Sequence, residues 1–340
     1  MKGRALVGLC VVSAVTFGLA SSGGANDSTA GLANGGLVLT KSADIEMQSE
    51  DLYISAKQVR VRYSFLNTST KDITVTVAFP LPDVTTNGFD DNLAIPLDKF
   101  PDFVGFSTVV DGKPVTTQLE QKALKNGVDE TAFLQKLGVG PQLMDDRSTA
   151  VINHLTQAAK DQLVKLGLIV DTGSGDPTNE YEPTWTLKTT YYWSQTFPAG
   201  KPVIVQHSYT PSVGGLLGSV LAYAPGPSDA AATQALADTR KEYCVDDDLY
   251  ATATALTKAS PDSFALYDEY IDYVLTTGAN WKAPIGDFRM TIDKGAANNL
   301  VSFCGTNVQK TGATTFQVHY LNFTPTADVH VLILSRTEPK

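Results

Sequence analysis

Beyond its first 25 residues, the sequence has no apolar run long enough to cross a membrane. The start of the chain is typical of a secretory signal peptide. A short basic segment precedes an uncharged apolar stretch, residues 5–20, and the small residues Gly23 and Ala25 follow as at a cleavage site. We therefore expect residues 1–25 to be a signal peptide, a mature chain that starts near Asn26, and no transmembrane segment after its removal.

Cysteine is also scarce, with three residues in a chain of 340. Cys10 lies in the expected signal peptide, which leaves Cys244 and Cys304. Two cysteines without clustered histidines make a poor zinc site, whereas a pair of cysteines in an exported protein most often forms a disulfide. We expect this bond, and closing a loop of about 60 residues stabilises a fold by roughly 4 kcal/mol in the chain-entropy model.

Basic residues are outnumbered, 26 against 36 acidic residues, for a net charge of −10. Without the signal peptide the balance would be about −12, because two of the basic residues lie within it. A field of that sign repels phosphate backbones. The composition therefore argues against a nucleic-acid partner.

The patterns of common catalytic and metal sites are missing. No G-x-S-x-G elbow occurs, and the glycine-rich "SVGGLLGS" lacks the Lys-Ser/Thr of a phosphate loop, so we expect a flexible loop from Pro211 to Pro227. None of the histidines, at positions 154, 207, 319 and 330, belongs to an H-x-x-x-H pattern, although distant strands could still assemble a metal site. We assign no catalytic residue and no cofactor.

The stretch "LIVDTGSGD" resembles the catalytic loop of an aspartic protease around Asp171. Such an enzyme needs two carboxylates that share a proton, and no second Asp-Thr-Gly or Asp-Ser-Gly occurs. The preceding residues 163–169 have the spacing of an amphipathic helix. We therefore interpret Asp171 as the polar boundary that follows a helix.

Three adjacent carboxylates, Asp246, Asp247 and Asp248, are weak candidates for a calcium site. The spaced ligand pattern of a calcium loop is missing. The alternative is a capped helix start, where carboxylates complement the positive end of the helix dipole. Calcium thus remains an open possibility at these residues.

Aromatic residues gather in two stretches, "WTLKTTYYW" and "YDEYIDYVLTTGANW". An exposed patch of Tyr192, Tyr267, Tyr270, Tyr273 and Trp281 could bind glycans or a partner protein. The alternative is that these rings pack in the core of a sandwich.

Alternating apolar and polar residues predict strands over much of the chain. "QVRVRYSFLN" and "ITVTVAF" are expected to pair as a hairpin, as are "TWTLKTTYYWSQTF" and "PVIVQHSY", and Asp102 to Val115 is expected to turn at Asp111-Gly112. Helical spacing appears from about Thr116, with a helix capped by Asp129, and again at 228–258. The fold class we expect is mainly β, with antiparallel β-sandwich regions and helical insertions, α+β overall.

This pattern divides the mature chain into three parts. We expect an N-terminal β region at 26–115, a helical insertion at 116–182, and a C-terminal β region at 183–340 that contains the helices at 228–258. No internal repeat, coiled coil or low-complexity tract interrupts these parts.

Residues 35–83, 185–215 and 272–305, which include "RVRYSFLN", "VAFPLPD" and "TTGANWKAPIGDF", resemble an exported bacterial family catalogued as domain of unknown function 4424. The similarity extends over nearly the whole mature chain. It implies a periplasmic protein of a Gram-negative bacterium, and it implies no activity, because none is established for the family.

A more local likeness, over residues 59–121, is to the VIT domain of inter-alpha-trypsin inhibitors. It is carried by "FLN", "AFPLPD" and "VGFSTVVDGKPV", and it implies a β-sandwich interaction module without catalysis. The von Willebrand-type partner domain and its metal motif do not occur in this sequence.

These observations favour an exported, non-catalytic envelope protein that acts as a binding or structural β-sandwich module in the periplasm. Its expected partner is another envelope protein or a cell-surface polymer. The alternative is a periplasmic hydrolase of envelope glycan or peptide, because two carboxylates at a set separation in space suffice for glycoside hydrolysis.

Overall fold

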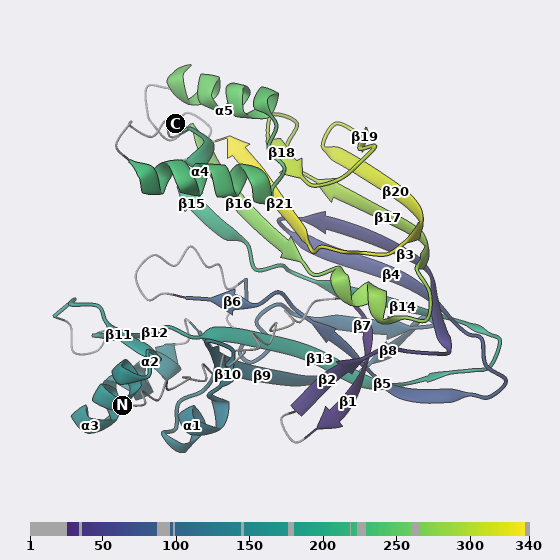
Figure 1. Cartoon of the computed structure of the whole chain (residues 1–340), viewed down its shortest axis with the longest axis horizontal. Helices are drawn as coiled ribbons and strands as arrows, with labels where there is room; N and C mark the ends of the chain where they lie inside the picture. The colour runs from purple at the N-terminus through teal and green to yellow at the C-terminus, as the bar shows by residue number, and fades with distance from the viewer. Residues whose placement is uncertain are drawn as a thin grey trace, which may run out of the picture.

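The computed structural model describes residues 26–33, 36–86, 96–97, 99–143, 146–175, 180–217, 219–222, 229–259 and 265–336. The expected signal peptide lies outside the described residues. Two large sheets pack face to face, and a four-stranded sheet with two helices continues the upper layer of Figure 1. The expected class, mainly antiparallel β with helical insertions, is confirmed. No helix in the described part of the chain is long and apolar enough to span a bilayer.

The lower layer of Figure 1 is a seven-stranded antiparallel sheet of order β10-β9-β13-β5-β1-β2, with β6 beside β13. Its strands are β1 (Ser28–Ala33), β2 (Gly36–Thr40), β5 (Ile73–Pro80), β6 (Val84–Thr85), β9 (Gln118–Lys125), β10 (Val128–Asp129) and β13 (Thr186–Phe197). The central strand β13 buries Leu187, Tyr191 and Trp193 on one face, as its alternating sequence predicts.

The second large sheet has eight strands in the order β19-β20-β17-β3-β4-β14-β7-β8. They are β3 (Ile45–Ser55), β4 (Gln58–Asn67), β7 (Ser107–Val110), β8 (Lys113–Val115), β14 (Pro202–Tyr209), β17 (Ile285–Asp293), β19 (Gln309–Lys310) and β20 (Thr315–Phe323). Strands β3 and β17 pair in parallel, and the other neighbours pair antiparallel. The expected hairpin at Asp111-Gly112 is confirmed, and both turn residues have positive φ, +48° and +78°.

Two expected hairpins are wrong, because their strands lie in opposite sheets. β4 pairs with β3 and β14, whereas the next strand, β5, pairs with β1 and β13. β13 and β14 are separated in the same way. Each chain connection therefore crosses the sandwich, and the apolar faces meet through side chains, with the ring centroids of Phe65 and Phe197 5.7 Å apart. The alternation predicts which face of each strand is apolar. That face is the same whether two successive strands pair in one sheet or lie in opposite sheets.

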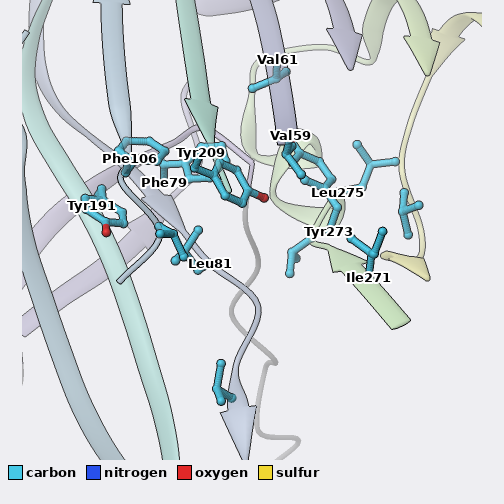
Figure 2. Close-up of a cluster of buried hydrophobic side chains, with 14 of the residues drawn as sticks. Val59, Val61, Phe79, Leu81, Phe106, Tyr191, Tyr209, Ile271, Tyr273 and Leu275 are labelled. Atoms are coloured by element: carbon cyan, nitrogen blue, oxygen red, sulfur yellow. The ribbon is translucent and has the colours of Figure 1, made fainter. Parts of the chain in front are cut away.

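An aromatic core fills the space between the two large sheets. Figure 2 shows Phe79, Phe106, Tyr191 and Tyr209 from both sheets converging on it, with Tyr273 from the four-stranded sheet. The Phe106 and Tyr191 rings stack with centroids 4.2 Å apart. Aromatic contacts of this kind bury much apolar area and lock the two sheets together.

The four-stranded sheet has the order β15-β16-β21-β18, formed by β15 (Gly214–Leu217), β16 (Leu266–Tyr273), β18 (Leu300–Phe303) and β21 (Val329–Arg336). One face joins the main core, and the other packs under α4 (Ala230–Glu242) and α5 (Asp247–Ala259), which confirms the helices expected at 228–258. The loop expected from Pro211 to Pro227 instead contains β15 and a short 3₁₀ helix, Val220–Ala222. Backbone pairing with β16 orders this glycine-rich stretch.

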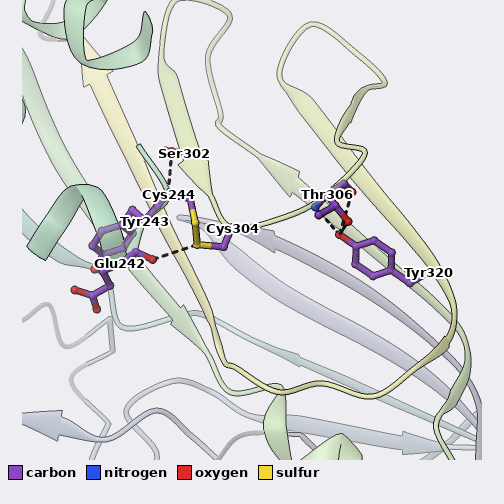
Figure 3. Close-up of a disulfide and its surroundings, with 7 residues drawn as sticks. All are labelled: Glu242, Tyr243, Cys244, Ser302, Cys304, Thr306 and Tyr320. Carbon is purple, nitrogen blue, oxygen red and sulfur yellow. Dashed lines mark hydrogen bonds between the residues drawn. A yellow bond between two sulfur atoms is a disulfide. The ribbon is translucent and has the colours of Figure 1, made fainter. Parts of the chain in front are cut away.

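A disulfide joins Cys244, just after α4, to Cys304, just after β18, as the cysteine count predicts. Figure 3 shows this bond next to Tyr243, whose carbonyl accepts a hydrogen bond from Ser302 Oγ at 2.9 Å. The bond therefore ties the helical layer to the sheet beneath it.

The insertion at the lower left of Figure 1 comprises α1 (Thr131–Lys136), α2 (Asp146–His154), α3 (Gln157–Lys165) and the strand pair β11 (Ile169–Asp171) and β12 (Tyr181–Pro183). The helical expectation from Thr116 is wrong for β9, which pairs with β13 over residues 118–124. Helix α1 begins one residue later than expected, and the Asp129 carboxylate accepts a hydrogen bond from the Thr131 amide at 3.0 Å.

The helix expected to run to Ile169 ends at Lys165, because Gly167 adopts a positive φ of +67°. Asp171 therefore ends a strand rather than following a helix. Its carboxylate accepts a hydrogen bond from the Gly173 amide at 2.8 Å, which is a local turn contact.

Candidate anion-binding groove and buried polar cluster

The outer face of β4 presents two arginines at alternate positions. Val59, Val61 and Tyr63 face the core, so Arg60 and Arg62 face solvent from the middle of the eight-stranded sheet. Their cross-strand neighbours are Tyr53 and Asp51 on β3 and Ser208 and Gln206 on β14. The sheet order thus places one row of polar side chains across several strands.

This row lines a groove of about 480 Å³, which we call the Arg60–Arg62 groove. Its other walls come from Ser107 and Val109 on β7 and Thr291 on β17. The Tyr53 hydroxyl donates to Asp293 Oδ2 at 2.8 Å and thereby fixes the ring. The Arg60 guanidinium lies over that ring, 4.5 Å from its centroid, a cation–π contact.

Neither arginine of the groove forms an ion pair with a carboxylate in the described part of the chain. Asp51 is in register with Arg62, yet the two side chains make no ion pair. The groove therefore exposes two guanidinium groups on a chain whose net charge is −10.

A second, smaller pocket of about 130 Å³ lies between the segment after β5 and the end of β14. Its walls include Asp83, Asp272, Tyr209 and Tyr270. Burial raises the pKa of the Asp83 carboxyl, against the attraction of Lys188. Asp272 accepts a hydrogen bond from His330 Nδ1 at 2.7 Å.

A buried polar cluster surrounds His207 in the core. His207 Nε2 lies 3.0 Å from Asp27 Oδ1, and His207 Nδ1 lies 3.0 Å from Thr108 Oγ1. Thr108, His207 and Asp27 thus lie in the order of a nucleophile, a base and an orienting carboxylate. The imidazole is fully enclosed, with the rings of Phe79, Phe106 and Trp193 around it, so a substrate could not reach the threonine.

A β-bulge in β3 brings a second carboxylate, Glu50, into this cluster. The register with β4 shifts between Met47 and Ser49, which reverses the alternation so that Glu50 points inward. Asn26 Nδ2 donates to Glu50 Oε2 at 3.0 Å. Burial raises the pKa of the Glu50 carboxyl to about 8, although the hydrogen bond from Asn26 acts in the opposite direction.

Two of the three candidate calcium ligands make contacts within the helical layer. Asp246 Oδ1 accepts a hydrogen bond from the Leu249 amide at 2.7 Å and so caps α5, and Asp247 pairs with Arg240. In the part of the chain that the structure describes, no three His, Cys, Asp or Glu side chains form a group that could hold a metal ion. The geometry therefore matches the capped helix start.

The aromatic candidates are divided between the core and the surface. Tyr273 and Trp281 are 0% and 1% exposed, so they are core residues and not part of an exposed patch. Trp281 Nε1 donates to the Asp27 carbonyl at 2.8 Å. Tyr192, Tyr267 and Tyr270 are half-buried, and they lie on different sheets, since Tyr192 is on β13 and the other two are on β16.

The sequence alone does not single out the Arg60–Arg62 groove. A signal is present, because two like charges at positions i and i+2 of a strand must share its outer face. The other walls of the groove cannot be predicted from this signal, because they come from β3, β14, β7 and β17.

A family model described as "Domain of unknown function (DUF4424)" matches residues 25–332 of the chain. Among solved structures, the chain is similar to the crystal structure of "a putative nutrient binding protein" from Legionella pneumophila subsp. pneumophila str. Philadelphia 1. The two share 16% sequence identity with a TM-score of 0.44, over 91% of this chain and 70% of that one. No curated protein sequence matches the chain.

Proposed function

The chain belongs to the DUF4424 family, and we propose that it is an exported, non-catalytic binding module of the bacterial envelope that holds an anionic polymer in the Arg60–Arg62 groove. The observation that carries this proposal is the pair of outward arginines without a carboxylate partner among the described residues, in a groove of about 480 Å³. A guanidinium offers five N–H donors in a planar fork, which suits carboxylate and phosphate groups.

Some other exposed cations of this acidic chain have carboxylate partners. Arg289 pairs with Asp287 at 3.2 Å, and Lys282 pairs with Glu46 at 3.3 Å. Arg60 and Arg62 differ in that two guanidinium groups share one face of a strand inside a groove, and neither forms an ion pair within the described chain, which supports a site for an external anion. The groove volume lies within the range of about 300–1,000 Å³ that is common for ligand sites.

The shape of the groove favours a chain-like ligand over a compact one. Its walls come from β17, β3, β4, β14 and β7, and strands in a sheet lie about 4.8 Å apart, so it spans roughly 20 Å. A cell-surface polymer with repeated acidic groups could contact both arginines at once. The polar side chains of Gln206 and Ser208 would contact uncharged parts of the polymer.

Isothermal titration calorimetry with a soluble polyuronate and a soluble polyphosphate tests this proposal. The double variant Arg60→Gln/Arg62→Gln should bind at least about tenfold more weakly, because each charge-assisted hydrogen bond contributes about 1.5–3 kcal/mol. The matched control is Arg289→Gln, since Asp287 already neutralises Arg289. Equal binding by wild type and double variant would refute the groove. If a pull-down from envelope extract retains an acidic envelope protein and neither polymer binds, the partner is a protein.

One observation favours a hydrolase as the second candidate. Asp83 and Asp272 line one pocket together with two tyrosines, and a buried carboxyl with a raised pKa is suited to general-acid catalysis. The pocket, at about 130 Å³, is smaller than common ligand sites, which places this candidate second. Release of sugar or peptide from isolated cell wall, abolished by Asp83→Asn, would support it.

A further inference from the structure

The first described residues lie inside the protein. Asn26, Asp27 and Ser28 are each 0% exposed. The Asn26 backbone amide donates to Thr277 Oγ1 at 2.9 Å, and Thr277 Oγ1 donates to the Asn26 carbonyl at 2.7 Å. With the bond from Trp281 Nε1 to the Asp27 carbonyl, these contacts hold the backbone at 26–27 against the segment around the 3₁₀ helix Thr276–Asn280.

Negative groups exceed cations at this point of the core. Asp27 and Glu50 are both buried carboxyl groups, and within the described residues the basic side chain that pairs with either of them is His207, beside Asp27. Glu50 has only neutral hydrogen-bonding neighbours among the described residues, the Asn26 side chain, which donates to its Oε2, and the Tyr273 hydroxyl. A buried carboxylate without a cation is costly, so this cluster calls for a further positive partner.

Hydrogen-bond donors are also too few. Three fully buried oxygens of the described cluster lack a donor, namely Asn26 Oδ1, Asp27 Oδ2 and Glu50 Oε1. All three belong to Asn26, to its neighbour in the chain, or to the carboxyl group that Asn26 contacts. Buried acceptors of this kind are normally satisfied, so a donor is missing in the surroundings of Asn26.

We propose that the Ala25–Asn26 bond is the site of proteolytic maturation, and that the α-ammonium group of Asn26 released there becomes the internal counter-charge of Asp27 and Glu50. Hydrolysis adds water across this bond, which leaves a carboxylate on Ala25 and an α-ammonium on Asn26. A backbone amide has one N–H donor, whereas the ammonium has three and a positive charge. The ammonium group thus supplies both the hydrogen-bond donors and the positive charge that the cluster lacks.

The sequence and the burial agree with this assignment. Gly23 and Ala25 are small residues at the positions that signal peptidases require. Asn26, Asp27 and Ser28 are fully buried in succession, so an amino group released at Asn26 lies inside the protein. Only the cleavage step rests on the proposed export of the protein. The charge pairing between the α-ammonium group and the two carboxylates can be tested without export.

Two forms of the protein, released from a fusion by a protease in vitro, test the pairing. One begins at Asn26, and the other retains Gly24 and Ala25. The form that begins at Asn26 should melt about 5 °C or more higher, because breaking a buried ion pair is strongly destabilising. At neutral pH, Glu50→Gln should lower the melting temperature of this form and should not lower that of the longer form, where it removes a buried carboxyl without a counter-charge. Asp51→Asn, on the outer face of the same strand, should leave both unchanged.

Equal melting temperatures of the two forms, or the same effect of Glu50→Gln in both, would overturn the pairing and would favour a buried water as the missing donor. If the longer form does not fold, amine acylation of the short form followed by mass spectrometry decides. The α-amine should react far more slowly than the surface lysines in the native protein and at least as fast as they do after unfolding, because its ordinary pKa is lower than that of lysine. A native α-amine as reactive as the lysines would refute the proposal.

Amino-terminal sequencing of protein recovered from the bacterial envelope tests the cleavage itself. A first residue of Asn26 supports it, and a first residue elsewhere overturns it. Neither result depends on the Arg60–Arg62 groove, so the failure of this inference can be distinguished from a failure of the binding proposal.

Discussion

His207 Nε2 and Asp27 Oδ1 lie 3.0 Å apart although the two residues are 180 positions apart in the sequence, and both side chains are fully buried. The contact joins β14 to the segment that enters β1. Because the removal of one partner leaves the other uncompensated, we expect Asp27→Ala to lower the free energy of unfolding by about 3–5 kcal/mol. Urea unfolding measures this loss. The double variant with His207→Ala should lose less than the sum of the single variants, and strict additivity would contradict the coupling.

Glu50 should make stability depend on pH in a chain that retains residues before Asn26. Burial raises the pKa of its carboxyl from 4.5 to about 8, so the folded state holds its proton to a higher pH than the unfolded state. The resulting stabilisation is fully present below pH 4.5 and is lost as the pH rises toward 8. The free energy of unfolding of wild type relative to Glu50→Gln should therefore fall across this window, by roughly 1.4 kcal/mol for each pH unit.

Urea titrations at intervals from acid to alkaline pH measure that difference. A difference independent of pH would contradict the buried carboxyl. In the form that begins at Asn26, the α-ammonium should favour the ionised carboxylate and flatten the same curve.

Reduction of the Cys244–Cys304 disulfide should lower the free energy of unfolding by about 4 kcal/mol, because the bond closes a long loop in the unfolded chain. The two cysteines are 60 positions apart. Thermal unfolding with and without a thiol reductant measures the loss. The double variant Cys244→Ser/Cys304→Ser should match the reduced protein and be insensitive to reductant, and two free thiols in the non-reduced protein would rule out the bond.

Asp246→Ala should destabilise the protein by about 1 kcal/mol through the loss of a helix cap, because its carboxylate accepts from the Leu249 amide. Millimolar calcium should leave the melting temperatures of wild type and variant unchanged. Asp248→Ala is the matched control, since this exposed residue lies in the first turn of α5 and contributes through the helix dipole. A calcium-dependent rise in the wild type that Asp246→Ala abolishes would instead indicate a metal site.

The sequence predicted the faces of strands better than their partners. The alternation along β4 and β13 correctly placed Val59 and Trp193 in the core and Arg60 on the outer face. It failed on pairing, because a strand that crosses to the opposite sheet has the same period as one that turns back beside its neighbour. It also failed at Ile169, where a short apolar run can end a helix or form a strand.

The buried polar cluster could not have been predicted in this way. "NDST" at 26–29 consists of residues that are usually exposed, and Glu50 lies in a strand where strict alternation would turn it outward. Asp27 is placed by His207, and Glu50 is placed by the bulge after Met47. The first cause is a contact between distant segments and the second is an irregularity in the register of β3 with β4, and neither leaves a pattern of apolar and polar residues in the sequence.

The parallel pairing of β3 with β17 sets the order in which this molecule can be assembled. Tyr53 on β3 and Asp293 on β17 are in hydrogen-bond contact although 240 residues separate them. A chain that emerges amino-terminus first therefore leaves one edge of β3 without its partner until the last quarter of the chain is available. Such non-local pairing slows folding, so refolding should be limited by this late closure, and a chain truncated at residue 259 should expose the open edge and aggregate in a sedimentation assay.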